Sequence, residues 1–216
     1  MKSMGHFHLT MTEKVNKEKV SLKNVWFFNM DEYITEDGKW IDIDHPLSFR
    51  GFMRDHVYTM INPDLVMSES HRIFPDPDDP GYCDRMLSDL GGADMCVGGI
   101  GINGHVAFNK ADESLTGVIF LKQTTRIRPV SPATIVTGAI GSYHGALEEM
   151  PKYCITIGMK QIYTSKVIRL GCFRDWHRGV VRRATFGDPT AAFPVTLLQS
   201  HPDTRIMITE YVATLD

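Results

Sequence analysis

Short apolar segments alternate with helical patterns along most of this chain, and this alternation limits the possible folds more than any other feature. Residues 24–28 are typical of a buried strand, and a helical pattern with one apolar face follows at 48–61. The other expected elements are helices at 82–90, 132–150, 159–164 and 173–184 and strands at 93–97, 118–121, 154–157, 166–170 and 205–209. Such alternation indicates βαβ units. The sequence therefore predicts an α/β protein, a single three-layer α/β/α domain over residues 1–216 with a doubly wound, mainly parallel sheet.

Composition excludes several classes of protein. Lys plus Arg number 23 against 26 for Asp plus Glu, a net charge of −3 that lacks the basic excess of a nucleic-acid binder. No apolar run approaches the roughly 18 residues that cross a bilayer, and the N-terminus lacks the apolar core of a signal peptide. The four cysteines, at 83, 96, 154 and 172, stand far apart. We expect reduced, buried thiols in a cytoplasmic protein that binds neither nucleic acid nor membranes.

An acidic pair follows the first expected strand. Asp31 and Glu32 come just after residues 24–28. Open α/β sheets bind ligands at the carboxyl ends of their strands, so a carboxylate here is held on a rigid element and can act as a general base. The alternative is that Asp31 or Glu32 caps a following turn or helix.

A glycine-rich segment follows the strand expected at 93–97. Residues 98–104 contain four glycines, and His105 comes next. Glycine lets the backbone approach a ligand closely or adopt a positive φ, and histidine can carry protons near neutral pH. The spacing matches neither the GxGxxG of dinucleotide-binding helices nor a P-loop. The segment therefore favours a proton-transfer site over a nucleotide site.

These two segments carry a family resemblance. Residues 29–33 (NMDEY) and 99–109 (GIGINGHVAFN) resemble the signature segments of the glucosamine-6-phosphate deaminase (isomerase) family. Residues 151–159 and 198–202 resemble later parts of the same family, in the same order along the chain. The resemblance runs from about residue 3 to the end. It implies a doubly wound α/β fold and a small sugar phosphate as substrate.

The resemblance implies an aldose–ketose isomerisation coupled to loss of ammonia, from glucosamine-6-phosphate to fructose-6-phosphate. Asp31 falls on the carboxylate that moves a proton between C2 and C1, and His105 on the histidine that opens the sugar ring. Asn103 falls beside that histidine, and Gly101 and Gly104 on the loop that contacts the open-chain substrate. No metal or organic cofactor is needed for such proton transfers. Members of the family are often oligomeric, so a homo-oligomer is expected as an alternative to a monomer.

The chain departs from the family's pattern around the histidine. Asn103 stands where the family commonly has Asp, and an amide orients the imidazole without stabilising its charged form. Lys110 stands where the family has a Glu that assists ring opening. Asp112 and Glu113 lie close behind and can substitute for it if the loop bends differently.

The phosphate contacts also differ. Ser131 falls on a family arginine, although Arg126 and Arg128 are near in sequence. Arg174 falls on a family lysine and keeps the positive charge, and arginine suits bidentate phosphate contacts.

Residues 3–7 resemble the end of the family's phosphate loop, where Ser3 and Gly5 would contact the phosphate. The strand that precedes this loop in the family has no counterpart here. Without it, two neighbouring strands would have open hydrogen-bonding edges. We expect either a fragment of a longer chain, a start at an internal Met, or an edge rebuilt by a partner or a changed fold.

Two other functions share the expected fold. A 6-phosphogluconolactonase would use the glycine-loop histidine as a general base and would not need Asp31 as a proton carrier. A non-catalytic paralogue would bind a sugar phosphate without turnover, which Asn103 and Lys110 favour. Activity of the Asp31→Asn variant separates these alternatives from the deaminase.

Overall fold

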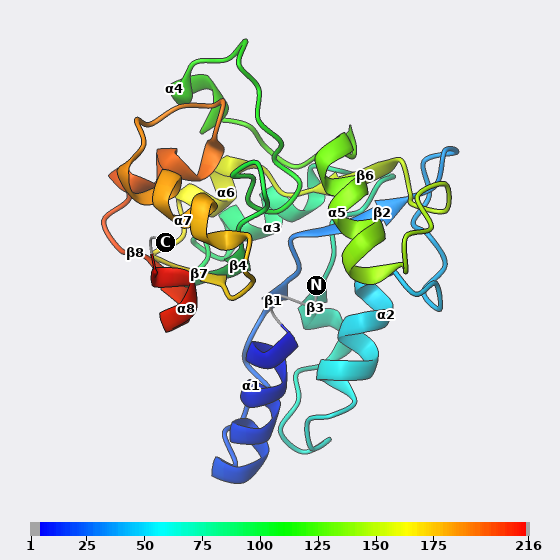
Figure 1. Ribbon diagram of the computed structural model, residues 1–216. Coiled ribbons are helices and arrows are strands. Elements are labelled where there is room, and N and C mark those ends of the chain that lie inside the picture. The colour runs from blue at the N-terminus through cyan, green and yellow to red at the C-terminus, as the bar shows by residue number, and fades with distance from the viewer. Residues whose placement is uncertain (1–4, 215–216) are drawn as a thin grey trace.

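Helices and strands alternate along the chain in the computed structural model, which describes residues 5–214 (Figure 1). The α-helices are α1 (Gly5–Glu18), α2 (Phe49–Met53), α3 (Tyr82–Asp89), α4 (Gly117–Phe120), α5 (Pro132–Ser142), α6 (Met159–Tyr163), α7 (His177–Phe186) and α8 (Glu210–Ala213). Shorter turns are the π-helix η1 (Arg54–Tyr58), which continues α2, and the 3-10 helices η2 (Glu69–His71) and η3 (Pro194–Ser200). The strands are β1 (Phe27–Phe28), β2 (Asp31–Ile34), β3 (Arg72–Ile73), β4 (Met95–Gly99), β5 (Arg126–Pro129), β6 (Tyr153–Thr156), β7 (Val167–Cys172) and β8 (Thr204–Ile208).

The strands pair in three groups. β1 pairs with β3, and β4, β7 and β8 lie side by side in that order, all in parallel. β2, β6 and β5 form an antiparallel group in that order. Within the described residues, the hydrogen-bonded neighbour of β1 is β3 and that of β4 is β7. The predicted α/β fold with mainly parallel pairing is confirmed, and the antiparallel group is an addition that sequence patterns did not indicate.

Most expected elements are present, with shifted ends. The helix expected at 132–150 ends at Ser142, and the one expected at 173–184 begins at His177, so Arg174 lies in the loop before α7. The strand expected at 118–121 is wrong, because this segment is α4, whose N-cap is Thr116. Val118 and Ile119 are 66% and 53% exposed, so this apolar run is not the buried strand that its hydrophobicity suggested.

Three apolar clusters hold the structure together. The largest packs β4 and β7 against α6, α7 and η3, the second lies between β2, β6 and α5, and the third joins α1 to α2 and η1. α1 begins near the strands and points away from them (Figure 1). Within residues 5–214, every helix is too short or too polar to span a bilayer. The four cysteines are buried and free, as expected.

Candidate active site

Asp31 opens β2, next to the central strand of the antiparallel group. Its register partner in β6 is Thr156, which is itself opposite Arg126 in β5. Residues directly opposite in antiparallel strands share a face of the sheet, so these three side chains lie on one face. Asp31 is only partly exposed. Burial, with the added effect of the neighbouring Glu32 charge, raises the pKa of Asp31 to about 7.

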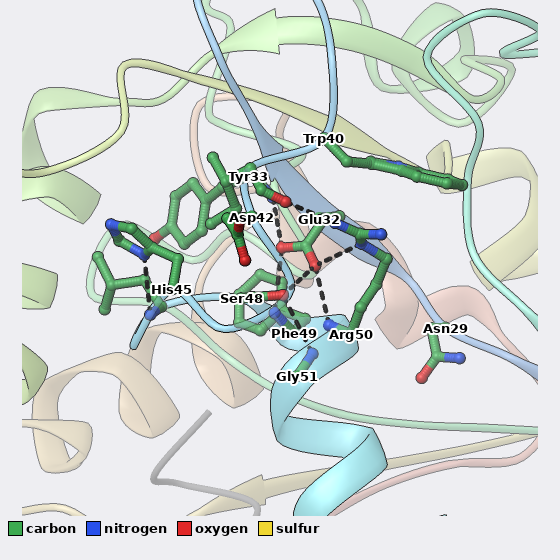
Figure 2. A network of polar contacts seen from close by, with 12 residues as sticks. Asn29, Glu32, Tyr33, Trp40, Asp42, His45, Ser48, Phe49, Arg50 and Gly51 are labelled. Atoms are coloured by element: carbon green, nitrogen blue, oxygen red, sulfur yellow. Dashed lines mark hydrogen bonds and ion pairs between the residues drawn. The ribbon is translucent and has the colours of Figure 1, made fainter.

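Glu32 points to the other side of β2 and has a different role. Its fully buried carboxylate accepts hydrogen bonds from the backbone N–H of Phe49 (3.0 Å) and Arg50 (2.8 Å) and from the Ser48 hydroxyl (2.9 Å), as Figure 2 shows. It also accepts from the N–H of Tyr33 (2.8 Å), and the Arg50 Nε lies 3.4 Å away. Glu32 therefore caps the first turn of α2, while Asp31 remains free of such contacts within the described residues.

Asn103 and His105 lie together on the loop after β4. The Asn103 Oδ1 contacts the His105 Nδ1. Because an amide oxygen only accepts, we assign the proton to Nδ1, which leaves Nε2 as an acceptor. Burial lowers the pKa of His105 to about 4, so the ring is neutral at neutral pH.

The glycines of this loop are required by close packing. The Gly101 N–H donates to the His105 carbonyl (2.9 Å), and a Cβ on Gly101 would lie 1.8 Å from the His105 ring. Gly104 has a φ of +76°, and a Cβ there would lie 2.5 Å from the Phe193 ring. Any side chain at Gly101 would therefore displace the imidazole.

The loop that carries His105 is bound to the strands beside Asp31. The Phe108 N–H donates to the Thr156 hydroxyl (3.1 Å), and the buried Asn109 amide donates to the Ile157 carbonyl (3.0 Å). Thr156 is the register partner of Asp31. The structure thus joins the two segments that the sequence singled out, through a threonine that sequence patterns did not indicate.

Arg174 follows β7, the strand next to β4. Its guanidinium lies against α5, where a Cβ on Gly141 would be 3.1 Å from the Arg174 Nη1. Its backbone N–H donates to Nδ1 of His177 (2.9 Å), a buried residue that sequence patterns also missed. Gly5 opens α1, and among residues 5–214 no hydrogen bond or ion pair connects it to Arg174. Ser3 lies outside the described residues.

Lys110, Asp112, Arg126 and Arg128 form a charged group near β5. Asp112 is bound by the hydroxyl and N–H of Ser114, and these bonds, with the nearby Arg128 and Lys110 charges, lower its pKa. Burial, followed by the Arg128 charge, lowers the pKa of Arg126 to about 10. The carboxylate of Asp112 is therefore already committed to a local turn.

Two hollows in the structure lie away from these side chains. One is lined by residues that include Asp84 and Lys160, and the other runs along α1 beside Met11. Asp31 follows β1, His105 follows β4 and Arg174 follows β7, so each of these three side chains comes after the carboxyl end of a parallel strand, where open α/β sheets bind ligands, and we place the candidate site there.

Comparisons with known proteins identify relatives of the chain. No family model matches the chain. A glucosamine-6-phosphate deaminase of Shewanella halifaxensis is 32% identical over 204 residues, 92% of this chain and 72% of that protein. A solved structure of a monomeric glucosamine-6-phosphate deaminase has a TM-score of 0.83 at 24% identity and covers 97% of this chain and 82% of its own. A 6-phosphogluconolactonase of Thermotoga maritima has a TM-score of 0.63 at 15% identity, covering 93% and 79%. The structural likenesses concern the fold.

Proposed function

Since this chain belongs to the glucosamine-6-phosphate deaminase family, we propose that it converts glucosamine-6-phosphate into fructose-6-phosphate and ammonia. The observation that carries the proposal is the connection of Asp31 to the His105 loop through Thr156. This connection supports a site in which a titratable carboxyl group and a neutral imidazole act on one substrate, as ring opening and proton transfer require.

Asp31 is the base in this proposal. In the open-chain aldehyde, its carboxylate takes the proton from C2 and returns it to C1. O1 gains a proton as the amino nitrogen loses one, so the product has a hydroxymethyl group at C1 and an imine at C2, to which water adds before ammonia leaves. A carboxyl group with a pKa of about 7 is half ionised near neutral pH, so it can both accept and release the proton.

His105 opens the ring. Its Nε2 accepts the proton of the anomeric hydroxyl and passes it to the ring oxygen, which breaks the bond between C1 and that oxygen. The contact between Asn103 and Nδ1 keeps Nε2 unprotonated. Because Asn103 carries no charge, the imidazolium formed during this step lacks a carboxylate partner, and we expect slow ring opening.

The phosphate is bound in this proposal by Arg174. Its guanidinium offers two parallel N–H donors to a phosphate group, a geometry that lysine lacks. We further propose that Gly5, at the N-terminus of α1, and Ser3 contact the same phosphate, and that Gly101 and Gly104 contact the sugar through their backbone.

The test is release of ammonia from glucosamine-6-phosphate by the purified chain, with fructose-6-phosphate measured in parallel. We expect both products, and a loss of about 10²- to 10⁴-fold in the Asp31→Asn variant. A folded chain that releases no ammonia contradicts the proposal. In that case, hydrolysis of 6-phosphogluconolactone unaffected by Asp31→Asn indicates a lactonase, and a thermal shift with glucosamine-6-phosphate alone indicates a non-catalytic binder.

We also propose that the chain works as a single domain in the cytoplasm. The buried, free thiols at 83, 96, 154 and 172 support a reducing compartment. The solved relative described above is monomeric. Size-exclusion chromatography with light scattering decides between a monomer and a homo-oligomer.

A further inference from the structure

His177 lies between the two loops that carry Arg174 and His105. It is the first residue of α7 and is 1% exposed. Its Nδ1 accepts a hydrogen bond from the Arg174 backbone N–H (2.9 Å), and its Nε2 is 3.0 Å from the Ile100 carbonyl oxygen. A buried histidine with both ring nitrogens bonded to different loops is a rigid connection.

The two bonds define the state of the ring. A carbonyl oxygen only accepts, so Nε2 carries the proton, and an N–H only donates, so Nδ1 is the acceptor. The imidazole is therefore neutral, with one tautomer. Burial, followed by the nearby Arg174 charge, lowers the pKa of His177, in agreement with this assignment.

Each bond leads to a group of the proposed active site. Ile100 is followed by Gly101, whose N–H bonds the His105 carbonyl and whose Cα packs against the His105 ring. The other bond holds the backbone of Arg174. The loops leave neighbouring strands at the same level, since Gly99 of β4 is paired with Gly171 of β7.

We propose that His177 is a positioning residue that couples the phosphate-binding loop to the ring-opening loop. When Arg174 binds phosphate, the shift of its backbone is transmitted through the imidazole to Ile100 and on to His105. This inference rests on the proposed function for the roles of Arg174 and His105, and it goes beyond that function by making the two loops act together.

His201 offers a matched control within the same chain. Its Nε2 is 2.8 Å from the Ser165 carbonyl, its Nδ1 accepts from the Asp203 N–H (3.2 Å), and it is 8% exposed. Ser165 and Asp203 precede β7 and β8, so this second bridge lies at the amino ends of the strands, opposite the site. Loss of either imidazole removes the same kinds of bond, but only one of them reaches the proposed active site.

Two variants separate the two bonds of His177. In His177→Asn, the amide oxygen can take the position of Nδ1 and keep the Arg174 bond, but the side chain is too short for Ile100. In His177→Gln, the amide nitrogen can take the position of Nε2 and keep the Ile100 bond, while the Arg174 bond is lost. Since misplacement by about 1 Å costs up to about 100-fold, we expect a lower kcat in His177→Asn and a raised KM in His177→Gln.

The kinetic experiment compares these variants and His177→Ala with His201→Ala, all checked by thermal melting. We expect His177→Ala to change both constants and His201→Ala to change neither, at similar losses of melting temperature. The proposal is overturned if both histidine-to-alanine variants change the constants alike, or if His177→Asn and His177→Gln have wild-type kcat and KM.

A second readout does not depend on turnover. Inorganic phosphate is titrated into the chain labelled at its histidines, and the ring-nitrogen signals of His105 are followed by NMR. Phosphate shifts these signals in the wild type and in His201→Ala but not in His177→Ala if the coupling exists. An inactive wild type that shows this pattern counts against the proposed function alone, whereas His105 signals that ignore phosphate in the wild type, or still respond in His177→Ala, overturn the coupling.

Discussion

The two groups proposed to transfer protons are held in contrasting ways. Asp31 lies on a strand, and the carboxylate of the adjacent Glu32 accepts three hydrogen bonds from the first turn of α2 and one from the N–H of Tyr33. His105 lies on a loop, where one amide contact and the absence of a side chain at Gly101 set its position. The position of the Asp31 carboxyl group therefore depends on the buried hydrogen bonds of the neighbouring Glu32. The position of the His105 imidazole depends on its close packing against the backbone of Gly101.

Burial acts on both groups but moves their pKa values in opposite directions. It raises that of Asp31 to about 7 and lowers that of His105 to about 4, because it disfavours the charged form of each. At neutral pH the carboxyl group titrates while the imidazole stays neutral. One physical cause thus prepares a base on the strand and a proton acceptor on the loop.

The largest expected effect is that of Glu32→Ala, which removes the hydrogen bonds that hold β2 beside Asp31. This change leaves the N–H groups of Phe49 and Arg50 and the Arg50 charge without their buried partner. We expect a loss of about 3–5 kcal/mol in the free energy of unfolding, measured by urea denaturation. Glu36→Gln is the control, since Glu36 forms an exposed ion pair with Lys152 and its loss should leave stability close to wild type. Equal stability of the two variants contradicts the assigned role of Glu32.

Gly101→Ala tests the packing that holds His105 on its loop. The new Cβ would overlap the His105 ring, so the imidazole must move, and kcat should fall by up to about 100-fold with little change in fold. Gly179→Ala is the matched control, because a Cβ there meets no atom within 4 Å on the exposed face of α7. It should raise stability by about 0.5–1 kcal/mol and leave kcat unchanged. A wild-type kcat in Gly101→Ala would show that His105 is not held as described.

Asn103→Asp places a carboxylate beside the His105 imidazole, as Glu32 is a carboxylate beside Asp31. An opposite charge in contact with Nδ1 favours the imidazolium, so the pKa of His105 should rise by about 1 unit or more. NMR titration of the histidine ring measures this change, with Asn24→Asp, at an exposed position before β1, as a variant of the same chemistry away from the His105 loop. If the pKa of His105 is the same in wild type and Asn103→Asp, the contact in the structure is not formed in solution.

Stability as a function of pH also distinguishes the two groups. Asp31 binds more protons folded than unfolded between its ordinary pKa of 3.8 and about 7, so its contribution to stability is lost as pH rises through this window. His105 has the opposite sign, because its lowered pKa makes stability rise with pH between about 4 and its ordinary 6.5. Asp31→Asn should therefore gain stability relative to wild type above pH 7 and not below pH 4. Parallel stability curves for the two proteins contradict the raised pKa of Asp31.

The parts of the fold that sequence patterns predicted are those where hydrophobicity and burial agree. β4 and β7 are apolar runs with buried residues and match the prediction, whereas β2 and β5 begin with Asp31 and Arg126 and were missed, since these polar residues interrupt the apolar pattern. The prediction of a strand at 118–121 is wrong because the segment is helical, with Phe120 buried while Val118 and Ile119 are exposed.

The candidate site also contains residues that sequence patterns predicted and residues that they did not. Asp31 and His105 stand in local motifs and could be found from sequence. His177 and Thr156 could not, because their partners are 77 and 48 residues away in the chain. Hydrogen bonds between residues so far apart in the chain depend on the register of β4 with β7 and of β2 with β6, which a single sequence does not reveal.

The most direct test of the account is the fate of the C2 hydrogen. Glucosamine-6-phosphate labelled with deuterium at C2 is followed by NMR in the presence of wild type and of Asp31→Asn, with thermal shift used to confirm that both bind it. The account predicts that wild type removes the label from C2 in step with ammonia release and that Asp31→Asn leaves it in place. Removal of the label by Asp31→Asn at the wild-type rate would contradict the central claim that Asp31 is the base.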